Sequence, residues 1–301
     1  MGNCVLNIHR LDMNKKRPDI VAYAYSTECG LGQAALMNIQ AMRSLGLEVE
    51  HRRWEGHLPN EDGLNCPEQI YYHHWHPQRQ EASRIWHSGE FGCARHVAYW
   101  AYEAVNDLPP EFLQLAPRMH EIWVPSRFCK EVFEPCGAPV HIVPHAVPDE
   151  IRSAVLSPPR TANAGTLVVF FVFDAWSRLA RKNPEASIRV FQRAFAERQD
   201  VRLVIKAHHL SSGEEEHLRQ CCGSDQRIIL HNAFIDKDAL CGLYESADIF
   251  LSLQRAEGFG LNIAHALAIG LPVITTAFGG HLDFCNEETA FLVRKPLSNC
   301  V

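Results

Sequence analysis

The sequence predicts an α/β protein built from two doubly wound parallel sheets, and three observations support this prediction. Short apolar segments alternate with segments of helical periodicity, which is typical of parallel strands covered by helices. The alternation stops at a segment rich in Pro, Ser, Ala and Gly, at about residues 148–165, and then restarts. The 301 residues also suit two domains of about 150 residues each. We therefore expect domains at residues 1–150 and 165–301, facing each other across a cleft.

The first domain is expected to begin with a strand, a glycine turn, a helix and a second strand. These elements correspond to residues 19–26, 27–33, 34–46 and 47–54. Ser126 is the expected N-cap of a later helix that begins at residue 127. The other strand candidates of this domain are residues 69–75, 96–102, 120–126 and 138–147.

In the second domain, residues 166–173 form an uninterrupted apolar segment, which indicates a strand buried on both faces. An amphipathic helix is expected over residues 183–198, with Pro184 in its first turn. The sequence DKD at residues 236–238 has a metal-binding spacing, but it precedes a helix, so Asp236 is expected to be an N-cap. The remaining strand candidates are residues 201–207, 226–234, 247–253 and 271–276.

Composition excludes several classes of protein. The net charge of −6 and the lack of a long basic segment argue against nucleic-acid binding. The 11 cysteines are scattered, with no C-x-x-C spacing, which favours reduced thiols in the core over zinc knuckles or a disulfide framework. The N-terminus has no apolar signal segment, and the longest apolar run, residues 167–173, is too short to span a bilayer. We expect a cytoplasmic protein.

The most informative segment is AEGFGLNIAHALAIG, residues 256–270. Glu257 lies between a strand that ends near residue 253 and a helix that begins near Leu261. Gly258 and Gly260 allow the backbone to approach a ligand, and the helix N-terminus is suited to a diphosphate. A carboxylate at Glu257 can accept hydrogen bonds from sugar hydroxyls. The alternative is an acid that only interacts with the helix dipole. His265, four residues into the helix, either lies above the same cleft or packs inside the domain.

Cations follow two strands of the second domain. The segment after residues 166–173 carries Arg178, Arg181 and Lys182, and Lys206 ends the next strand. Because the carboxyl ends of parallel strands share one edge, these cations are candidates to bind phosphate oxygens. Lys182 is the strongest candidate and Lys206 the next. A solvated basic loop is the alternative.

Four candidates for the acceptor side lie in the first domain. Gly30 and Gly32 form a turn at the head of the first helix, but Ala35 stands where a dinucleotide-binding loop has its third glycine. The other two candidates are His74, from the cluster of His73, His74 and His76, and Glu103, just past a strand end. Strand alternation sends His73 and His74 to opposite faces, so no metal site is expected there. His145 has a packing role or a ligand role.

Several of these segments together resemble GT-B glycosyltransferases of the retaining family 4, or group 1. Residues 243–284 are similar to the donor-binding segment, and residues 173–195 to the phosphate-binding loop and its helix. Residues 28–46, 99–112, 121–134 and 143–147 are similar to the acceptor domain of the same group. The resemblance implies the GT-B fold, with two Rossmann-like domains.

The resemblance also implies a function. A sugar would move from a nucleotide-diphosphate sugar to an acceptor hydroxyl with retention, with neither a cofactor nor an obligatory metal. Lys182 would neutralise the diphosphate with Lys206, and Arg178 is a candidate helper. Glu257 would hold the sugar hydroxyls. The rest of the donor site would be Gly258, Phe259, Gly260 and Leu261.

The chain departs from the family pattern at two points. His265 stands where the family has a second glutamate for the ribose. A neutral imidazole has one acceptor, so it can accept only one of the two ribose hydroxyl protons. The chain also stops soon after residue 294, where members usually continue with further helices, so the expectation is either weak domain closure or a fragment of a longer chain.

The acceptor implied by the resemblance is a glycan, a lipid-linked molecule or another hydroxyl compound. The resemblance is also compatible with peripheral membrane association. Two alternatives to a transferase stay open. One is a GT-B-shaped binding or partner protein with weak or no turnover, and the other is a sugar-nucleotide epimerase of the same fold.

Overall fold

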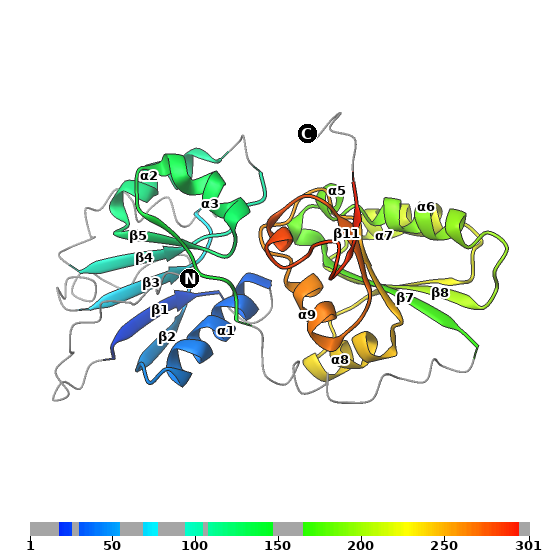
Figure 1. Cartoon of the computed structure of the whole chain (residues 1–301), viewed down its shortest axis with the longest axis horizontal. Helices are drawn as coiled ribbons and strands as arrows, with labels where there is room; N and C mark the ends of the chain where they lie inside the picture. Colours follow the sequence, from blue (N-terminus) through cyan, green and yellow to red (C-terminus); the bar gives the residue numbers. More distant parts are fainter. Residues whose placement is uncertain are drawn as a thin grey trace. The chain divides into compact units, whose positions relative to one another are not determined.

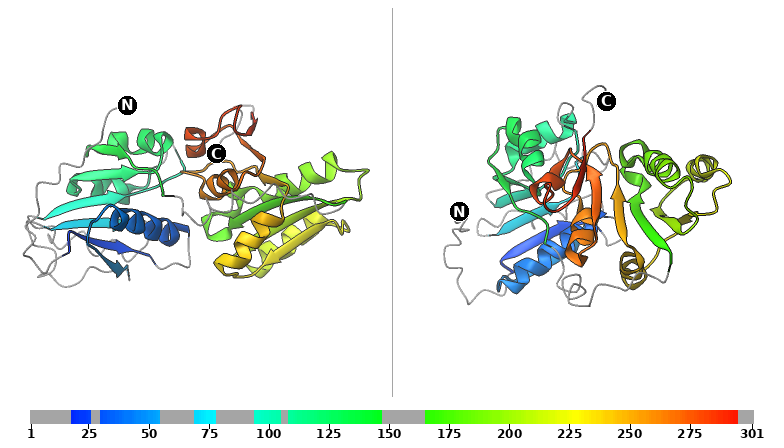
Figure 2. Two further views of the ribbon diagram at one scale, coloured as in Figure 1. Left: turned by 60° about the horizontal axis from the view of Figure 1, so that its bottom comes forward. Right: turned by 45° about the vertical axis from the view of Figure 1, so that its right-hand side comes forward.

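The structure is a computed structural model that describes residues 18–25, 30–54, 69–77, 94–104, 108–146 and 165–294. In this part of the chain the strands form two six-stranded sheets, as the alternation of the sequence predicted. Helices lie on both faces of each sheet, which Figures 1 and 2 show for each unit. The fold class predicted from the sequence, α/β with two doubly wound parallel sheets, is confirmed.

The first sheet has the order β2-β1-β3-β4-β5-β6, and its strands from β2 to β5 pair in parallel. Ile20 is in register with Val49 on one side and with Ile70 on the other. Helix α1 (Gly30–Ser44) connects β1 to β2 and lies against this sheet (Figure 1). The strands are β1 (Ile20–Ala24), β2 (Val49–Arg53), β3 (Ile70–His74), β4 (Arg95–Tyr99), β5 (Glu121–Val124) and β6 (Val140–Ile142).

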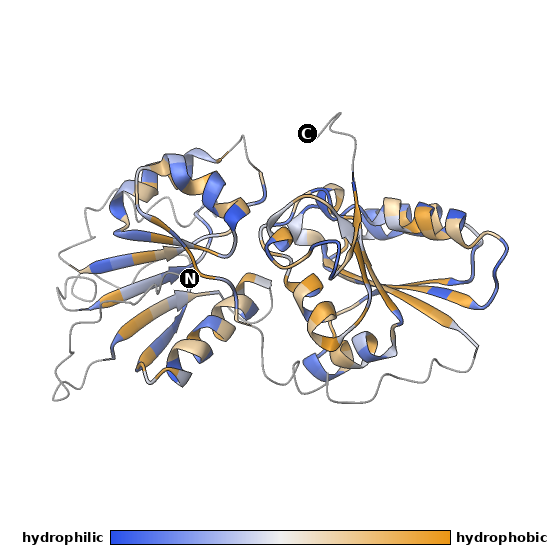
Figure 3. Ribbon diagram, viewed as in Figure 1, coloured by the Kyte–Doolittle hydropathy of each residue, from blue (hydrophilic) through white to orange (hydrophobic). Residues whose placement is uncertain are grey.

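The second sheet has the order β12-β11-β10-β7-β8-β9, and all of its neighbouring strands pair in parallel. Asp174, the last residue of β7, is in register with His208, the last residue of β8. Figure 3 shows that the central strands are strongly apolar, as strands covered on both faces must be. The strands are β7 (Leu167–Asp174), β8 (Val201–His208), β9 (Ile228–Asn232), β10 (Ile249–Ser252), β11 (Val273–Thr276) and β12 (Phe291–Val293).

The helix expected over residues 183–198 is α6, which the structure ends at Ala194. Asn183 adopts a left-handed conformation with φ of 53° and separates α6 from the one-turn helix α5 before it. Helices α3, α8 and α9 begin at or next to their expected first residues, whereas α1 begins four residues before the expected residue 34. The helices beyond α1 are α2 (Pro110–Leu115), α3 (Arg127–Phe133), α5 (Leu179–Lys182), α6 (Pro184–Ala194), α7 (Ser212–Cys222), α8 (Lys237–Ser246) and α9 (Leu261–Ile269), with short 3-10 turns η3 (Ala116–Arg118), η4 (Glu134–Cys136), η5 (Ala175–Ser177) and η6 (Gly280–Asp283).

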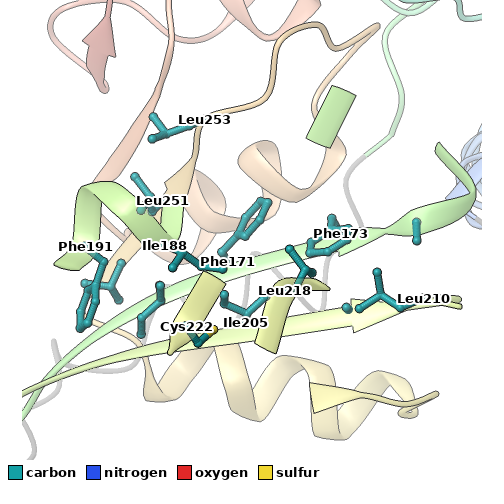
Figure 4. Close-up of a cluster of buried hydrophobic side chains, with 14 of the residues drawn as sticks. Phe171, Phe173, Ile188, Phe191, Ile205, Leu210, Leu218, Cys222, Leu251 and Leu253 are labelled. Carbon is teal, nitrogen blue, oxygen red and sulfur yellow. The ribbon is translucent and has the colours of Figure 1, made fainter. Parts of the chain in front are cut away.

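Each face of the second sheet has its own apolar core. On one face Phe171 and Phe173 of β7 pack with residues of α6 and α7, and these side chains converge in Figure 4. Phe170, which directly precedes Phe171 in the sequence, belongs to the opposite core with Tyr244 of α8 and Ile263 of α9. Because successive residues of a strand point to opposite faces, an uninterrupted apolar segment supplies both cores at once.

Two of the predicted helix caps are confirmed. Cys129 donates its backbone N–H to Ser126 Oγ at 3.1 Å, and Ala239 donates its backbone N–H to Asp236 Oδ1 at 2.8 Å. The turn expected at Gly30 and Gly32 is wrong, because α1 begins at Gly30 and includes both glycines in its first turn. Neither glycine has a positive φ, so the backbone conformation there needs no glycine.

The chain separates into two compact units. The first unit comprises residues 1–100, 109–123 and 136–139, and the second comprises residues 101–108, 124–135 and 140–301. The segment expected as a linker lies outside the described residues, apart from Gly165. Within the described part of the chain, the structure contains no helix that is long and apolar enough to cross a membrane.

Candidate functional site

The candidate site lies in the second unit, where the loops after β7 and β10 meet. Parallel strands end at one edge of a sheet, and ligands of doubly wound sheets bind beyond that edge. The backbone N–H of Arg255 donates to the carbonyl of Arg181 at 2.8 Å, and Asn183 Nδ2 donates to the carbonyl of Leu253 at 2.8 Å. These hydrogen bonds fasten residues 253–257 to residues 181–183, so two segments far apart in sequence form one surface.

Lys182 and Glu257 contact each other directly at this surface. Lys182 Nζ donates to Glu257 Oε2 at 2.7 Å, and the two side chains are only 14% and 17% exposed. Arg181 is the second cation: its Nη1 lies 3.5 Å from Glu257 Oε2, and its Nη2 lies 3.2 Å from Glu103 Oε1. Arg181 therefore contacts two carboxylates of the second unit, Glu103 and Glu257.

The electrostatics of Glu257 are set by these cations. Burial raises the pKa of the carboxyl, but Lys182, Arg181 and, to a smaller extent, His281 outweigh burial and lower the pKa to about 2. Burial lowers the pKa of Arg181, but Glu103 and Glu257 outweigh burial and raise it. The site therefore holds charged groups at neutral pH, and an ionised carboxylate only accepts hydrogen bonds.

The helix N-terminus next to Glu257 has the geometry that the sequence predicted. Gly260 precedes α9 with φ of 91°, a left-handed conformation that favours glycine. A Cβ at Gly260 would also lie 2.9 Å from the Cβ of His281. The first N–H groups of α9 therefore follow immediately after the acid, and the positive end of the helix dipole favours an anion there.

Sequence reasoning missed the two glycines that hold Glu257 in place. Gly280 donates its backbone N–H to the carbonyl of Glu257 at 2.6 Å. A Cβ at Gly280 would collide with the carbonyl oxygen of Gly258, and a Cβ at Gly279 would lie 2.7 Å from the carbonyl oxygen of Glu257. The adjacent glycines after β11 are visible in the sequence. The reason for them is the close approach of the backbone at Glu257 and Gly258, which only the folded structure shows.

Two more neighbours fix the loop from the α3 side of the second unit. Ser126 Oγ donates to the carbonyl of Gly258 at 2.6 Å, and the same carbonyl lies 3.3 Å from Cys129 Sγ.

His281 is fully buried, with Nε2 2.7 Å from the carbonyl oxygen of Thr276. Burial lowers the pKa of His281 despite the opposing effects of that carbonyl and of Glu257.

The other predicted cations lie elsewhere in this unit. Arg178 is exposed and has a positive φ of 64°, and Arg181 contacts Glu257 instead. Lys206 is only 5% exposed, and its Nζ donates to the carbonyl of Ala207 at 2.8 Å. Burial lowers the pKa of Lys206, with Asp174 acting in the opposite direction. Lys206 is in register with Val172, whose carbonyl accepts a hydrogen bond from Asn262 in the first turn of α9.

His265 lies in α9 with its ring edge-on to Tyr244 of α8, at 6.3 Å between centroids. In the part of the chain that the structure describes, its Nε2 is buried and has no hydrogen-bond partner. Burial, with a smaller effect of Lys237, lowers the pKa of His265 to about 4. The imidazole is therefore neutral at pH 7, and one buried nitrogen is left for a ligand or a water.

Phe259 and His145 have packing roles. The Phe259 ring packs edge-on to His145 at 4.9 Å and lies 5.2 Å from Phe284. Phe259 also lines an apolar cavity of about 680 Å³ beside α9, with Ala264, Leu267, Gly270, Leu271, Pro272, Phe284 and Thr289. Phe259 can therefore line a donor site only through its backbone. His145 is buried, and burial lowers its pKa to about 3 despite the opposing effect of Glu257.

Among the remaining acceptor-side candidates, His74 lies in the first unit, away from solvent. His74 is buried, with its ring stacked on Tyr99 at 4.5 Å and its Nδ1 3.0 Å from the Tyr72 hydroxyl. His73 is also buried, and its Nε2 lies 3.0 Å from His96 Nδ1. The two histidines thus have separate neighbours on opposite faces of β3, as the alternation predicted.

Comparison with known proteins agrees with this geometry. Residues 168–298 match the family model of glycosyl transferases group 1, and a search of curated protein sequences finds no match. The chain is similar in structure to a glycosyltransferase from Rickettsia africae, with 14% identity, a TM-score of 0.69 and coverage of 95% of this chain and 86% of that one.

Two further solved structures show the same likeness. HepE from Anabaena, in complex with UDP and glucose, has 13% identity and a TM-score of 0.66, over 92% of this chain and 86% of its own. A UDP-forming α,α-trehalose-phosphate synthase from Burkholderia xenovorans has 11% identity and a TM-score of 0.64, over 92% and 88%. The GT-B fold predicted from the sequence is confirmed, and the family match confirms a glycosyltransferase domain over residues 168–298.

Proposed function

With this glycosyl transferases group 1 domain as the premise, we propose that the protein transfers a sugar from a nucleotide-diphosphate sugar to an acceptor hydroxyl. The observation that carries the proposal is the contact of Lys182 and Arg181 with Glu257 directly before the N-terminus of α9. Two cations and a helix N-terminus suit a diphosphate, and a buried ionised carboxylate suits sugar hydroxyls.

Each group has a role in the proposed transfer. The bond between the anomeric carbon and the diphosphate oxygen breaks, the acceptor oxygen bonds to that carbon, and the acceptor proton passes to the departing diphosphate. Negative charge develops on the departing diphosphate, where Lys182, Arg181 and the first N–H groups of α9 stabilise it. Glu257 accepts hydrogen bonds from the sugar and fixes its position, which lowers the entropic part of the barrier.

The finer points of the reaction are also proposals. Retention of anomeric configuration follows from the resemblance to family 4. We propose that no metal is obligatory for transfer, as the resemblance implies, with the N-terminus of α9 adding to the positive charge of Lys182 and Arg181. The acceptor would be a hydroxyl of a glycan or of a lipid-linked molecule, with room for peripheral membrane association. The division into an acceptor domain at residues 1–150 and a donor domain at 165–301 belongs to the same proposal.

The choice of the first donor to test comes from the similar structures. HepE was solved with UDP and glucose, and an E. coli protein of the same fold was solved with UDP-2-fluoro glucose. UDP-glucose is therefore the first donor to assay, followed by other UDP-sugars and by GDP-sugars. A thermal-shift screen identifies the donor that binds, and release of UDP or GDP measures turnover with and without candidate acceptors.

Variants connect the activity to the site. We expect Lys182→Ala and Glu257→Gln to remove turnover, while Arg189→Ala leaves it unchanged, because Arg189 pairs with Glu185 on the exposed side of α6. Turnover that survives both site variants would contradict the proposal. So would a failure of every UDP- and GDP-sugar to bind or react.

A second candidate is a GT-B-shaped binding protein with little turnover, and His265 is the observation that favours it. Its buried Nε2 supplies one acceptor, where the family pattern has a carboxylate that accepts from both ribose hydroxyls. Nucleotide binding without sugar transfer in any acceptor screen would support this candidate. Slow transfer that disappears in Glu257→Gln would exclude it.

A further inference from the structure

Three side chains with metal-ligand chemistry converge at the carboxyl ends of β7 and β8. They are Asp174, His208 and His209, and one ligand atom from each lies within 4.8 Å of the others. All three are half-buried, so the cluster is held in place but reachable from solvent. These side chains have no part in the proposed sugar transfer.

The backbone brings the two histidines together in an unusual way. His208 is the last residue of β8, and neighbouring residues of a strand would point to opposite faces. His209 instead adopts a left-handed conformation with φ of 58°, which is uncommon for a residue with a side chain. The two rings consequently stack, with centroids 3.5 Å apart.

Neighbouring groups hold His209 and Asp174 in this arrangement. The Trp176 ring stacks on the other side of His209, with centroids 3.5 Å apart and planes 3° from parallel. Asp174 Oδ1 lies 3.0 Å from His209 Nδ1 and also accepts the backbone N–H of Trp176 at 3.0 Å. The ligands are therefore pre-positioned by their own neighbours, which is the arrangement that supports metal sites in proteins.

The chemistry of the three side chains suits metal binding. An imidazole nitrogen of each histidine can supply a lone pair to a metal. The carboxylate of Asp174 supplies the anionic ligand.

We propose that Asp174, His208 and His209 form a binding site for a divalent transition-metal ion such as Zn²⁺. Two imidazole nitrogens and one carboxylate oxygen suit zinc, copper or nickel, whereas Mg²⁺ and Ca²⁺ prefer oxygen ligands. Three protein ligands leave a coordination position open for water or a further ligand.

Zinc binding requires these side chains to move. Tetrahedral zinc with bonds of about 2.0–2.1 Å places its ligand atoms about 3.4 Å apart, against the present limit of 4.8 Å. Because the two imidazole rings are stacked, one of them must also rotate out of the stack so that both nitrogens point at one ion. The Trp176 ring is 61% exposed, so it leaves the cluster open to solvent on that side.

Metal titration of the full chain tests this proposal without reference to transferase activity. Zn²⁺ binding is measured by calorimetry, with the cysteines kept reduced, and Co²⁺ absorption reports the type of ligand. We expect one saturable site whose Co²⁺ complex shows ligand-field bands without a sulfur-to-cobalt charge-transfer band. Quenching of Trp176 fluorescence by Cu²⁺, absent in Trp176→Phe, is a second readout.

Substitutions assign the ligands. We expect His208→Ala and His209→Gly to weaken Zn²⁺ binding by about tenfold or more, since even supporting residues of metal sites contribute 10–100-fold. Glycine at position 209 tolerates the left-handed backbone, so the fold is preserved. The matched control is His217→Ala, because His217 is exposed and pairs with a carboxylate, Glu185, at 2.9 Å.

Four outcomes would overturn the proposal. The first three are the absence of a saturable site, an unchanged Zn²⁺ affinity in both cluster variants, and a Co²⁺ spectrum dominated by thiolate ligands. The fourth is a Zn²⁺ affinity of His217→Ala that falls as far as that of His208→Ala. Circular dichroism of each variant establishes that a lost site is not a lost fold.

Discussion

Replacement of Lys182 by Met is the perturbation that bears most directly on the proposed donor site. Methionine preserves most of the side-chain length and removes the ammonium group that lies 2.7 Å from Glu257 Oε2. Glu257 would then depend chiefly on Arg181, whose Nη1 is 3.5 Å from the same oxygen. A mostly buried carboxylate would thus lose its nearest compensating charge.

The structure gives the magnitude of the expected effect. At the observed separation of 2.7 Å, two unit charges attract by about 6 kcal/mol at an effective dielectric constant of about 20. Desolvation of both groups offsets much of this attraction, and removal of one partner of a buried pair typically costs about 3–5 kcal/mol. Because Arg181 remains, we expect Lys182→Met to lower the free energy of unfolding by about 2 kcal/mol.

A double-mutant cycle in urea measures this interaction. The single variants Lys182→Met and Glu257→Gln are compared with the double variant, and only the transition that responds to Glu257→Gln is fitted, since two units need not unfold together. We expect a coupling energy above about 1 kcal/mol. The control is Arg198→Met, which removes an exposed ion pair with Asp200 and should cause no measurable change. Additive losses in the cycle would refute the electrostatic reasoning.

Four further outcomes are expected. The low pKa of Glu257 contributes about 3 kcal/mol of stability. This contribution is complete above the ordinary pKa of 4.5 and is lost as the pH falls toward about 2, so the stability difference from Glu257→Gln should shrink in acid urea titrations. Gly280→Ala should cost about 3 kcal/mol or more, because its Cβ collides with the carbonyl oxygen of Gly258; unchanged urea stability would contradict that contact. His265→Glu should tighten UDP binding about tenfold or more in calorimetry, from roughly 1.5–3 kcal/mol for a charge-assisted hydrogen bond, and an unchanged affinity would exclude a ribose contact. Glu103→Gln should tighten UDP binding about two- to fivefold by freeing its salt-bridge partner, and weaker binding would show that the carboxylate helps the donor.

The parts of this molecule that the sequence predicted well are those determined by short-range patterns. The apolar segment of β7 predicts a strand buried on both faces, because it is short and rich in β-branched and aromatic residues, and Phe170 and Phe171 do lie in separate cores. The position of Glu257 before Gly260 and α9 is equally local, since an acid, a left-handed glycine and a helix N-terminus follow one another in the chain. Ser126 is identifiable as a cap for the same reason.

The features that the sequence did not predict depend on contacts between distant residues or on the backbone. Arg178 and Arg181 are the same residue type in the same loop, so the sequence does not show which of them contacts Glu257. The one-turn helix α5 directs Arg181 toward Glu257 and Glu103 and leaves Arg178 exposed. Gly280 is required only because its backbone closely approaches Gly258, 22 positions earlier. The left-handed backbone conformation at His209 is not predictable from the sequence, because residues other than glycine adopt that conformation uncommonly.

The charge balance of the site limits how a donor can bind. Lys182 and Arg181 supply two positive charges, and Glu257 and Glu103 supply two negative charges, so this cluster is formally neutral without a ligand. A diphosphate would add negative charge to a neutral cluster, and the two cations alone cannot compensate it while both remain bound to carboxylates. The additional positive potential must then come from the N-terminus of α9, or the sugar must displace Lys182 from Glu257 by hydrogen-bonding to the carboxylate. In the second case the ion pair seen here is a resting arrangement, and donor binding changes the partner of Lys182 from a carboxylate to a phosphate.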